Sequence, residues 1–591
     1  MNDKSHQLRL LGWFGSALVL IFSMISIRYV IAYGWPEDVL TWLYIPLAVI
    51  ALWSALTFVP VALLCAFTAV NGARKIIVNI AWLMATAAIG LVVLDSELFA
   101  ANQFHLTALT ARILGTPSWV FLGIVTLIAG VFLRHLLARI DRALKNDTGG
   151  GKGKWVATAI VGAILVSQSI HIWADATYRV SIPRFTHYLP LYQPATAVER
   201  LVDWGLVDLD AARRQQLNAK LDVGSSVNYP LAPLHCSKES SLNILLVVID
   251  AQRGDLIDPR ITPKLDRLAS SSSVFEKHHS GGNSSKMGLF SLFYGLPGTY
   301  FESFAAEQRS PVLIDQLQRQ GYAISILSSA ELYRPVELDR TAFANLDNIR
   351  LETPSANGLA WEKDRVITND WFAFLDRQQA DQPFFGFLFY GSANRRVFPP
   401  DLEAPSVAGD QRWQHYVNAI HYNDQLLGEV LDDLGRRNLI DSTVVIVTSD
   451  HGEEFSQSGS GFTGHGSAYT SDQLATPMVV RWPGVDPKRY SHRTSHHDLA
   501  PTLLKRALNC SSDASNFSVG KDLYFEKDWD WLIAASYSDF AIVEPSQVTI
   551  SRRGGLFELR DANYQVDTEL KLNPHVVTDA LAAMQRFYVQ P

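Results

Sequence analysis

The sequence predicts an N-terminal five-helix transmembrane bundle, followed by a C-terminal α/β domain that carries a small antiparallel C-terminal subdomain. Three observations lead to this prediction. The apolar residues of the 591-residue chain are concentrated in its first 175 residues, strand-like and helix-like segments alternate after Asn243, and shorter β-like runs follow Trp529. We therefore expect residues 1–174 to form the transmembrane domain, residues 175–241 an interfacial linker and residues 242–591 the α/β domain.

Five apolar segments of the first domain are long enough to cross a bilayer, which takes about 20 residues. The overlong second segment contains Pro46 and Pro60, so a tilt or a kink is expected there. Five such segments in a row, without an intervening soluble domain, argue against the buried core helices of a soluble protein. The segments are Leu11–Tyr33, Leu40–Val70, Ile76–Leu94, Trp119–Leu137 and Trp155–Trp173.

The Lys and Arg residues near the segment ends predict the orientation, because such residues are enriched in cytoplasmic loops. With the N-terminus inside, ten of them fall on the cytoplasmic side, against Arg112 and at most Arg28 on the outer side. An odd number of spans then delivers everything after Trp173 to the outside. The ten are Lys4, Arg9, Arg74, Lys75, Arg134, Arg139, Arg142, Lys145, Lys152 and Lys154.

The linker mixes aromatic residues, prolines and arginines, a composition typical of a membrane interface. Arg184 and Arg200 are candidate contacts for lipid phosphates. The alternative is a linker that lies along the bilayer surface and binds no specific ligand.

The cysteines and the charge of the chain bear on two further questions, disulfide formation and the kind of partner. Cys236 and Cys510 both fall in the part predicted to be outside, where a disulfide is allowed, but two cysteines alone do not indicate a pair and two separate thiols are the expected state. Cys65 lies within the second span. The formal net charge of −7 does not suggest a nucleic-acid partner. The basic run Lys145–Lys154 is interpreted as a topology signal beside anionic lipid.

The region after Asn243 alternates between strand and helix patterns. NILLVVID is continuously apolar, as in a strand buried on both faces of a parallel sheet. YAISIL, PFFGFLFYG, TVVIVTSD and TPMVVRWPG predict further strands, and TPKLDRLASSSS, PVLIDQLQRQG and RWQHYVNAIHYNDQLLGEVLDDLGRRN predict helices. This alternation predicts a doubly wound α/β domain. After Trp529, AIVEPSQVTISRR, LFELRD and a final helix predict the antiparallel appendage.

Two of the strongest predicted strands end in an acidic residue, at Asp250 and at Asp450, and His451 follows the second directly. Ligands of an open α/β sheet gather at the carboxyl ends of its strands. A single strand that ends in Asp is ordinary, because Asp favours turns and helix caps, but two such ends with an adjacent histidine indicate a metal site. Carboxylate oxygens and one imidazole suit Mn²⁺, Mg²⁺ or Zn²⁺, and the sequence does not choose among them.

The stretch HHSGGNSSKMGLFSLFYGLPG places small residues in front of an apolar helical pattern. A hydroxyl at a helix N-terminus faces free backbone N–H groups and the positive end of the dipole, which suits a phosphate or sulfate. A bound divalent cation activates such a hydroxyl as a nucleophile. Ser284 and Ser285 are the candidates, and the flanking Asn283 and Lys286 are candidate substrate-binding residues. The alternative is an ordinary N-cap serine.

Further histidines follow along the chain. His465 lies between two glycines, fourteen positions after His451, and is a candidate to bind metal, hold a substrate oxygen or protonate a leaving group. The alternative for His465 is an exposed loop residue. His496 and His497 directly precede Asp498, which resembles a helix N-cap, and we expect one of the two histidines to face the site and the other to face solvent.

In this order, the motifs resemble the alkaline phosphatase/sulfatase superfamily from Asn243 to the C-terminus. With five spans in front, the whole chain is similar to the YejM/PbgA-type inner-membrane proteins of Gram-negative bacteria, and more distantly to lipoteichoic acid synthases and phosphoethanolamine transferases. The resemblance rests on NILLVVID, TPKLDRLA, GLFSLFYGLPG, YVNAIHYNDQLLGEVLDDL, TVVIVTSDHGEEF, GHG, TPMVVRWPG and HHDLAPTLL.

The resemblance implies roles for individual residues. Asp250 matches the acidic metal ligand after the first strand, and Asp450 and His451 match the Asp-His metal pair. His465 matches the histidine of the HG motif, a candidate catalytic residue. His496 matches the histidine before DLAPTLL, a candidate substrate-binding residue.

The nucleophile position of the superfamily, which also contacts the metal, falls on Ser285 or Ser284. The distance to the turn at Gly295 favours Ser285. The implied reaction is displacement at a phosphorus or sulfur ester through a covalent intermediate on the hydroxyl.

The sequence departs from the superfamily in two places. The Cys/Ser-x-Pro-x-Arg pattern is missing around Ser285, so a formylglycine sulfatase is not expected. The lipid-headgroup transferases usually have Glu where Asp250 stands, and a histidine in the segment that here is GSANRRVFPP. That segment instead supplies Arg395 and Arg396, which are candidate grips on an anionic group.

The YejM/PbgA type is understood as a regulator of lipopolysaccharide synthesis that need not act as an enzyme. We therefore expect an inner-membrane regulator of envelope lipid homeostasis with a periplasmic, metal-binding, sulfatase-like domain. Its expected partners are membrane lipids, including lipopolysaccharide or lipid A, and an inner-membrane regulatory protein. The second hypothesis is an active metal-dependent phosphate or sulfate ester hydrolase, or a lipid-headgroup transferase, with a serine nucleophile.

Overall fold

The structure is a computed structural model that falls into two compact units. The helical unit comprises Met1–Val227 with Tyr588–Pro591, and the α/β unit comprises Asn228–Phe587. The boundary lies inside the predicted linker, residues 175–241. The described residues are 3–33, 35–36, 38–71, 74–102, 104–146, 152–179, 181–186, 189–209, 211–213, 227–237, 242–379, 381–457, 459–537, 539–552 and 555–589.

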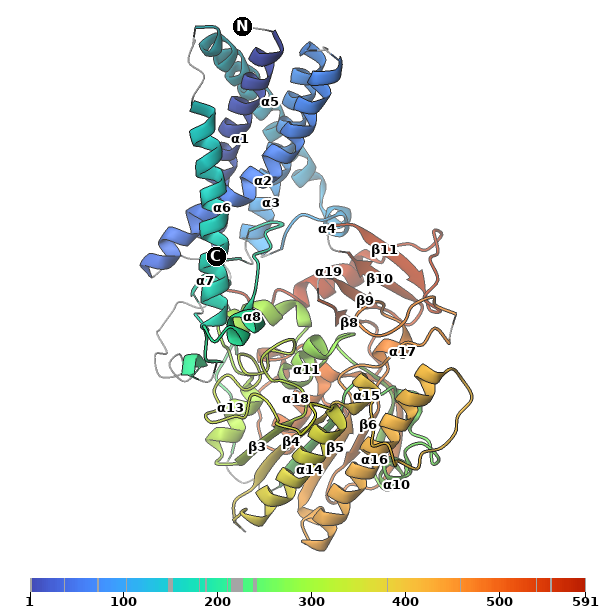
Figure 1. Ribbon diagram of the computed structural model, residues 1–591. Helices are drawn as coiled ribbons and strands as arrows, with labels where there is room; N and C mark the ends of the chain where they lie inside the picture. Colours follow the sequence, from blue (N-terminus) through green and yellow to red (C-terminus); the bar gives the residue numbers. More distant parts are fainter. Residues whose placement is uncertain are drawn as a thin grey trace. The chain divides into compact units, whose positions relative to one another are not determined.

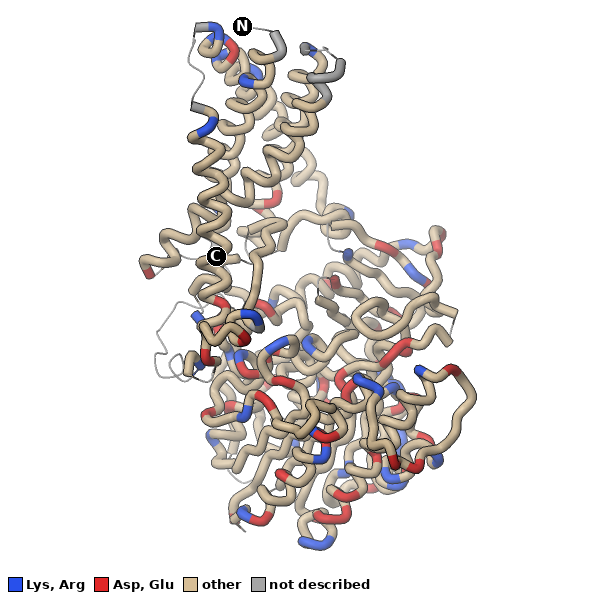
Figure 2. The backbone as a smooth tube through the Cα atoms, in the orientation of Figure 1, with Lys and Arg blue, Asp and Glu red and all other residues tan. Residues whose placement is uncertain are grey.

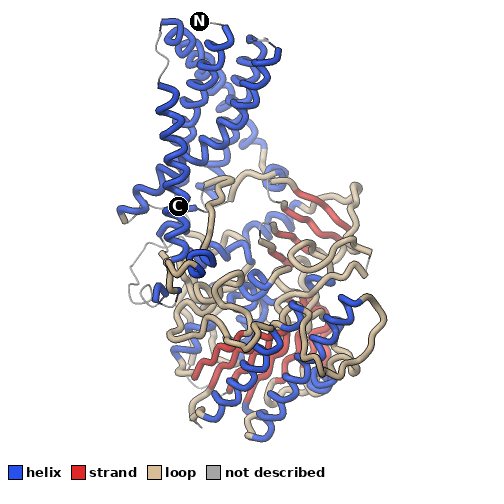
Figure 3. The backbone as a smooth tube through the Cα atoms, in the orientation of Figure 1, coloured by secondary structure: helices blue, strands red, loops and turns tan. Residues whose placement is uncertain are grey.

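Among the described residues, five helices of the helical unit are long and apolar enough to cross a membrane, as predicted (Figures 1 and 3). Pro46 and Pro60 lie inside the second of them. The helices of this unit are α1 (Asp3–Tyr33), α2 (Val39–Asn71), α3 (Arg74–Asn102), α4 (Ala108–Ile113), α5 (Thr116–Asn146), α6 (Lys152–Ala176), α7 (Ser181–Thr186) and α8 (Val198–Asp203).

Charged residues are sparse along the middle of the bundle. Figure 2 shows them mostly at the helix ends, with Lys and Arg grouped at the end that holds the N-terminus. At that end, the Asp141 carboxylate of α5 contacts His6 Nε2 of α1 at 2.8 Å and Lys145 Nζ at 2.6 Å. The uncharged middle is the part that suits the hydrocarbon core of a bilayer.

Much of the predicted linker packs onto the bundle. Helix α7 contacts α2 and α6, and Ile182 and Leu189 are buried in the same apolar core as the long helices. Beyond them, the backbone N–H of Ala195 donates to Gln168 Oε1 at 2.7 Å, and the Ala195 carbonyl lies 3.1 Å from His171 Nδ1. Tertiary packing against the long helices therefore contributes to holding this segment in place.

The α/β unit begins with the strongly apolar strand that the sequence predicts. Its main sheet contains β1 (Asn243–Ile249), β2 (Ser273–His279), β3 (Ala323–Ser328), β4 (Phe384–Tyr390), β5 (Thr443–Thr448), β6 (Met478–Arg481) and β7 (Lys488–Ser495). Its helices are α10 (Pro263–Ser270), α11 (Ser285–Tyr294), α12 (Phe301–Ala306), α13 (Val312–Arg319), α14 (Ala360–Asp376), α15 (Ser392–Arg395), α16 (Gln411–Arg436), α17 (Ser471–Leu474) and α18 (Leu499–Arg506).

The seven strands follow the order β3-β4-β1-β5-β6-β2-β7. Strands β3, β4, β1 and β5 run parallel, as expected for strands joined by helices, and β2 pairs with β7 in parallel. Strand β6 is antiparallel to both of its neighbours, so the sheet is mixed. Strands β2 and β7 are absent from the predicted set because their polar side chains (SVFEKHH and KRYSHRTS) hide the strand pattern.

Both faces of the main sheet are covered. On one face, alternate residues of the central strands, such as Leu245 and Leu388, share an apolar core with α10, α14 and α16. The opposite alternation points to the other face, where Phe387 packs edge-to-face against Phe293 of α11 with ring centroids 5.2 Å apart. Burial on both faces explains why these strands are continuously apolar.

The C-terminal part forms the antiparallel appendage that the sequence predicts. Its four strands follow the order β11-β10-β9-β8, each antiparallel to its neighbour, and the final helix comes after them (Figure 1). These elements are β8 (Leu532–Ala535), β9 (Phe540–Val543), β10 (Gln547–Ser551), β11 (Phe557–Asp561) and α19 (Pro574–Ala583).

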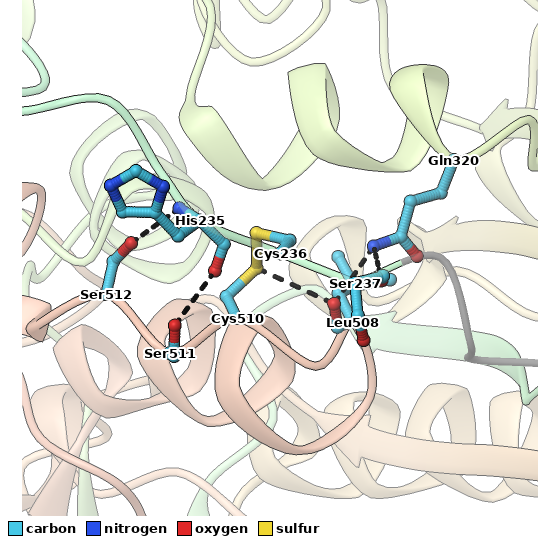
Figure 4. The surroundings of a disulfide bond; sticks show 8 residues. All are labelled: His235, Cys236, Ser237, Gln320, Leu508, Cys510, Ser511 and Ser512. Atoms are coloured by element: carbon cyan, nitrogen blue, oxygen red, sulfur yellow. Dashed lines mark hydrogen bonds between the residues drawn. A yellow bond between two sulfur atoms is a disulfide. The ribbon is translucent and has the colours of Figure 1, made fainter.

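Cys236 and Cys510 form a disulfide bond across 274 residues of sequence. The expectation of two separate thiols is therefore wrong, because the fold brings two short segments together that the sequence cannot pair. Figure 4 shows the surrounding contacts, in which the backbone N–H of His235 donates to Ser512 Oγ at 2.7 Å and Gln320 Nε2 donates to the Leu508 carbonyl at 2.9 Å.

Replacing both bridged cysteines by serine is expected to lower the free energy of unfolding of the α/β unit by about 2–5 kcal/mol, because the crosslink restricts the unfolded chain. Chemical denaturation of the full chain under non-reducing conditions measures the loss. The matched control is Cys65→Ser, which alters a cysteine of α2 outside the bridge. Equal denaturation midpoints for the double variant and the unmodified chain would contradict this prediction.

Candidate metal and ester site

The sheet topology brings the two predicted acidic strand ends together. Strands β1 and β5 are parallel neighbours, with Val248 paired to Thr448. Asp250 and Asp450 follow these strands at the same edge of the sheet. Direct pairing of the two strands therefore brings the two acids to the carboxyl-end edge of the sheet, where open α/β sheets bind ligands.

Asp250, Asp450 and His451 form a compact, buried group. Each offers one ligand atom, and these atoms all lie within 4.8 Å of one another. His451 Nε2 lies 3.6 Å from Asp250 Oδ1 and 3.5 Å from Asp450 Oδ2. The spacing is that of three donors arranged around one centre.

The hydrogen bonds of this group leave its inward atoms available. Asp450 Oδ1 accepts from the backbone N–H groups of Ala251 at 3.0 Å and His451 at 2.9 Å, whereas Asp450 Oδ2 is buried without a hydrogen-bond partner. His451 Nδ1 lies 2.8 Å from the Gly452 carbonyl, which assigns the proton to Nδ1 and leaves a lone pair on Nε2. An orphaned carboxylate oxygen beside an imidazole lone pair fits a divalent cation.

Burial makes the charges of this group costly without a cation. Burial, with the nearby Asp450 carboxylate, raises the pKa of Asp250 well above its ordinary value. Burial also lowers the pKa of His451, which favours its neutral, metal-binding form. A divalent cation would supply the positive charge that the two acids lack, so the donor set suits Mn²⁺, Mg²⁺ or Zn²⁺, as the sequence predicts.

The structure distinguishes the two candidate serines. Ser285 opens helix α11, and its Oγ lies 3.2 Å from His451 Nε2. Ser284 is the N-cap residue of the same helix, and its buried side chain makes no capping hydrogen bond. Ser285 is therefore the hydroxyl that faces the three donors, in agreement with the choice based on spacing.

Helix α11 can approach the site only because Gly288 has no side chain. A Cβ atom at this position would lie 2.0 Å from the Asp450 carbonyl oxygen, well inside the contact distance of any real Cβ. At the other end, Gly295 ends the helix in the left-handed conformation at φ 65°. The two glycines hold the serine helix against the strand end that carries the acids.

Asn394 is a site residue that the sequence analysis missed. It lies in α15, directly after β4, and its Nδ2 is 2.9 Å from both carboxylate oxygens of Asp250. The buried Asp364 carboxylate holds this turn by accepting from the backbone N–H groups of Gly391 at 2.9 Å and Ser392 at 3.0 Å. The signal was present in the sequence, because GSAN follows a predicted strand as Asp250 does.

Replacing Asn394 by leucine, which has a similar volume, is expected to weaken divalent-cation binding by about 10- to 100-fold, because Asp250 loses the donor that orients it. Titration of the full chain with Mn²⁺ measures the affinity. Asn345→Leu is the matched control, since Asn345 Nδ2 donates to Asp315 at 2.8 Å away from the three donors. Equal Mn²⁺ affinity in the two variants would refute the role of Asn394.

Glu453 joins two of the predicted residues. Its Oε1 accepts from Arg396 Nη1 at 2.6 Å, and its Oε2 lies 2.9 Å from His465 Nδ1. The rings of His465 and His451 are 4.5 Å apart between centroids, so His465 stands beside the metal group. Burial by itself raises the pKa of Glu453, but the hydrogen bond and charge of His465 outweigh it and lower the pKa overall.

The remaining candidates for substrate binding differ in their burial and in their hydrogen-bond partners. Asn283 Nδ2 donates to the Ala468 carbonyl at 2.8 Å. His496 is fully buried, with Nδ1 3.2 Å from the Gly288 carbonyl, and burial lowers its pKa to about 4. His497 is also buried, against the expectation that one of the two histidines faces solvent. Arg395 is exposed.

Lys286 is bound by acidic residues in this structure. Its ammonium nitrogen lies 3.0 Å from Glu302 Oε1 and 3.0 Å from Glu337 Oε1. Arg396 is likewise engaged, with Glu453. Two of the candidate residues for an anionic group, Lys286 and Arg396, therefore already hold carboxylates of the chain itself.

Of the two candidate lipid contacts, Arg200 is exposed on α8. The side chain of Arg184 lies outside the described residues.

The sequence matches two known families. Residues 242–509 match the Sulfatase family, and residues 1–236 match a family described as a domain of unknown function, DUF3413. The inner membrane protein YejM of Salmonella typhimurium is 25% identical over 590 residues, which cover 97% of this chain and 96% of the relative. An uncharacterized protein of Haemophilus influenzae is 24% identical over 571 residues, which cover 94% of this chain and 92% of that protein.

Among solved structures, a protein in the alkaline phosphatase superfamily from Vibrio parahaemolyticus matches 63% of this chain and 92% of its own, with a TM-score of 0.48 and 16% sequence identity.

Proposed function

Because this chain is a multi-pass inner-membrane protein homologous to the YejM proteins and carries a sulfatase domain, we propose that the domain binds a divalent cation and acts on a phosphate or sulfate ester. The observation that carries the proposal is the convergence of Asp250, Asp450 and His451 on one point beside the Ser285 hydroxyl. The two acids and the histidine lie beyond the carboxyl ends of β1 and β5, where open α/β sheets bind their ligands, and Ser285 approaches His451 there.

The residues have distinct tasks in this reaction. Asp250, Asp450 and His451 would hold the cation, which when bound lowers the pKa of a nearby hydroxyl and polarises an ester oxygen. Ser285 supplies the nucleophilic oxygen: its hydroxyl loses its proton to solvent, and the oxygen forms a bond to phosphorus or sulfur while the bond to the leaving alcohol breaks. Water then cleaves the serine ester, which releases phosphate or sulfate and restores the Ser285 hydroxyl. His465, held by Glu453, is placed to give the departing oxygen its proton.

We place this domain outside the inner membrane, in the periplasm. The distribution of Lys and Arg around the five spans supports that orientation. The Cys236–Cys510 disulfide supports it independently, because disulfides persist in oxidising compartments and are rare in the cytosol.

We propose regulation of envelope lipid homeostasis, including lipopolysaccharide, as a second function. The similarity to YejM over 97% of the chain favours it, since that similarity includes the membrane part as well as the sulfatase domain. Its partners would be membrane lipids, including lipid A, and an inner-membrane regulatory protein. In this function, the cation site would serve to order the domain and need not turn over substrate.

One experiment separates the two functions. Asp450→Ala and Ser285→Ala variants of the full chain are tested for complementation of envelope function in cells, alongside metal content and p-nitrophenyl phosphate turnover of the purified protein. Variants that insert and fold but fail to complement support the ester chemistry. Full complementation by both variants would make catalysis dispensable and would leave regulation as the function.

A further inference from the structure

Glu337 is a buried carboxylate on which three cationic side chains converge. Its Oε1 lies 3.0 Å from Lys286 Nζ and 3.6 Å from Arg334 Nη1, and its Oε2 lies 3.9 Å from Arg340 Nη1. The Lys286 ammonium also contacts Glu302 and lies 4.1 Å from the centre of the Phe301 ring. Three cationic side chains around one carboxylate resemble an anion-binding site more than a simple ion pair.

The cluster is buried enough for its charges to matter. The side chain of Glu337 is 7% exposed, and those of Lys286 and Arg340 are each 10% exposed. Removing the negative charge of Glu337 would take away a carboxylate that these two poorly hydrated cations share, which is unfavourable. The cluster therefore favours a negative charge at the position of the Glu337 carboxylate.

Glu337 occupies this position with a strained backbone. Its φ of 51° lies in the left-handed region, which residues with a side chain rarely adopt. It also lies in an irregular segment between β3 and α14, not in a helix or strand. Moving Glu337 out of this position would release the backbone strain, so its displacement costs less than that of a residue in a helix or strand.

The cluster adjoins the candidate nucleophile. Lys286 directly follows Ser285 in α11. The phenol of Tyr537, which follows β8, lies within range of the charges of Lys286, Asp250 and Asp450, so the lysine belongs to the same part of the α/β unit as the two acids. The three cationic side chains around Glu337 and the Ser285 hydroxyl are thus neighbouring parts of the α/β unit.

We propose that Lys286, Arg334 and Arg340 form an anion-binding subsite, and that Glu337 closes it by standing in for the anionic group of a ligand. The inference rests on the proposed ester chemistry and names its substrate class: an ester with a further anionic group beside the one that reacts, such as a second phosphate. Binding of that group would displace the Glu337 carboxylate. The site is closed until a substrate with two anionic groups reaches it.

The test uses inorganic phosphate as the probe and the isosteric variant Glu337→Gln in the full chain. Titration calorimetry in EDTA is expected to show phosphate binding at least about tenfold tighter to the variant than to the unmodified chain, and tighter than acetate binding to the same variant. Phosphate binding no tighter than in the unmodified chain would overturn the proposal. Equal binding of acetate and phosphate would also overturn it, because it would indicate only a vacated ion pair.

Glu302→Gln is the matched control. Glu302 contacts the same ammonium at the same 3.0 Å, but its side chain is 47% exposed, so water replaces its charge and no gain in phosphate affinity is expected. If Glu337→Gln fails to fold, Glu337→Asp keeps the charge and withdraws it by one methylene, and a phosphate affinity above that of the unmodified chain is expected. Unchanged affinity in Glu337→Asp would count against the subsite.

Because EDTA removes divalent cations, this test of the subsite does not depend on the cation site of the proposed ester chemistry. Phosphate binding to Glu337→Gln without any Mn²⁺ binding to the unmodified chain would leave the subsite standing and refute the cation-dependent reaction. Mn²⁺ binding without a gain in phosphate affinity would refute the subsite alone.

Discussion

Asp450→Ala is expected to abolish divalent-cation binding, with a loss in affinity of about 100-fold or more. The variant removes the one oxygen of the group that is buried without a hydrogen-bond partner. It also removes the acceptor that fixes the backbone N–H groups of Ala251 and His451, so the remaining donors lose their alignment. Metal content after dialysis and Mn²⁺ titration of the full chain measure the loss.

Asp433→Ala is the matched control for Asp450→Ala. Asp433 is also a buried acid, but it lies on α16 and pairs with Arg436 and Arg437. Its removal costs stability and is expected to leave the cation affinity unchanged. Unchanged metal content in Asp450→Ala would remove the basis of the metal site.

Ser285→Ala is expected to reduce the turnover of p-nitrophenyl phosphate by about 10³-fold or more, since the nucleophilic oxygen is lost while the fold is kept. Ser284→Ala is expected to retain most of the activity. The physical reason is that only the Ser285 hydroxyl lies within 3.2 Å of His451 Nε2. Steady-state kinetics of both variants in Mn²⁺, with thermal unfolding to verify folding, measure the difference.

The opposite ranking of the two serine variants would transfer the nucleophile to Ser284. Equal, undiminished turnover in both would mean that the activity does not use this site. A chain that binds Mn²⁺ but shows no turnover of phosphate or sulfate esters would leave the regulatory function as the better account.

Hydrophobic length and periodicity were sufficient to predict the architecture. The five spans, the strands around Asn243–Ile249 and Thr443–Thr448, and the antiparallel appendage all appear where the sequence predicts them. These elements are specified locally, because each is marked by the pattern of apolar residues along its own length. Strands β2 and β7 were missed because they are polar, and because β2 pairs with β7 and β6, which lie far away from it in the sequence.

Local patterns were less informative where a partner lies far away in the sequence. Cys236 and Cys510 are joined across 274 residues, and nothing within either segment indicates the other. Arg396 was predicted to grip an anion, and the fold instead gives it Glu453. A charged side chain pairs with an opposite charge that the fold brings close to it. The sequence alone does not show which charged residues will be neighbours.

The sequence by itself determined the membrane bundle, the α/β class and the residue types of the candidate site, because apolar length, strand periodicity and acidic strand ends are properties of short segments. The tertiary structure decided which atoms meet. It turned Ser285 rather than Ser284 toward the acids, added Asn394 to Asp250, and placed Glu337 among three cations. Distances of a few ångströms between segments 50 to 200 residues apart depend on strand order and helix packing, and no single segment contains that information.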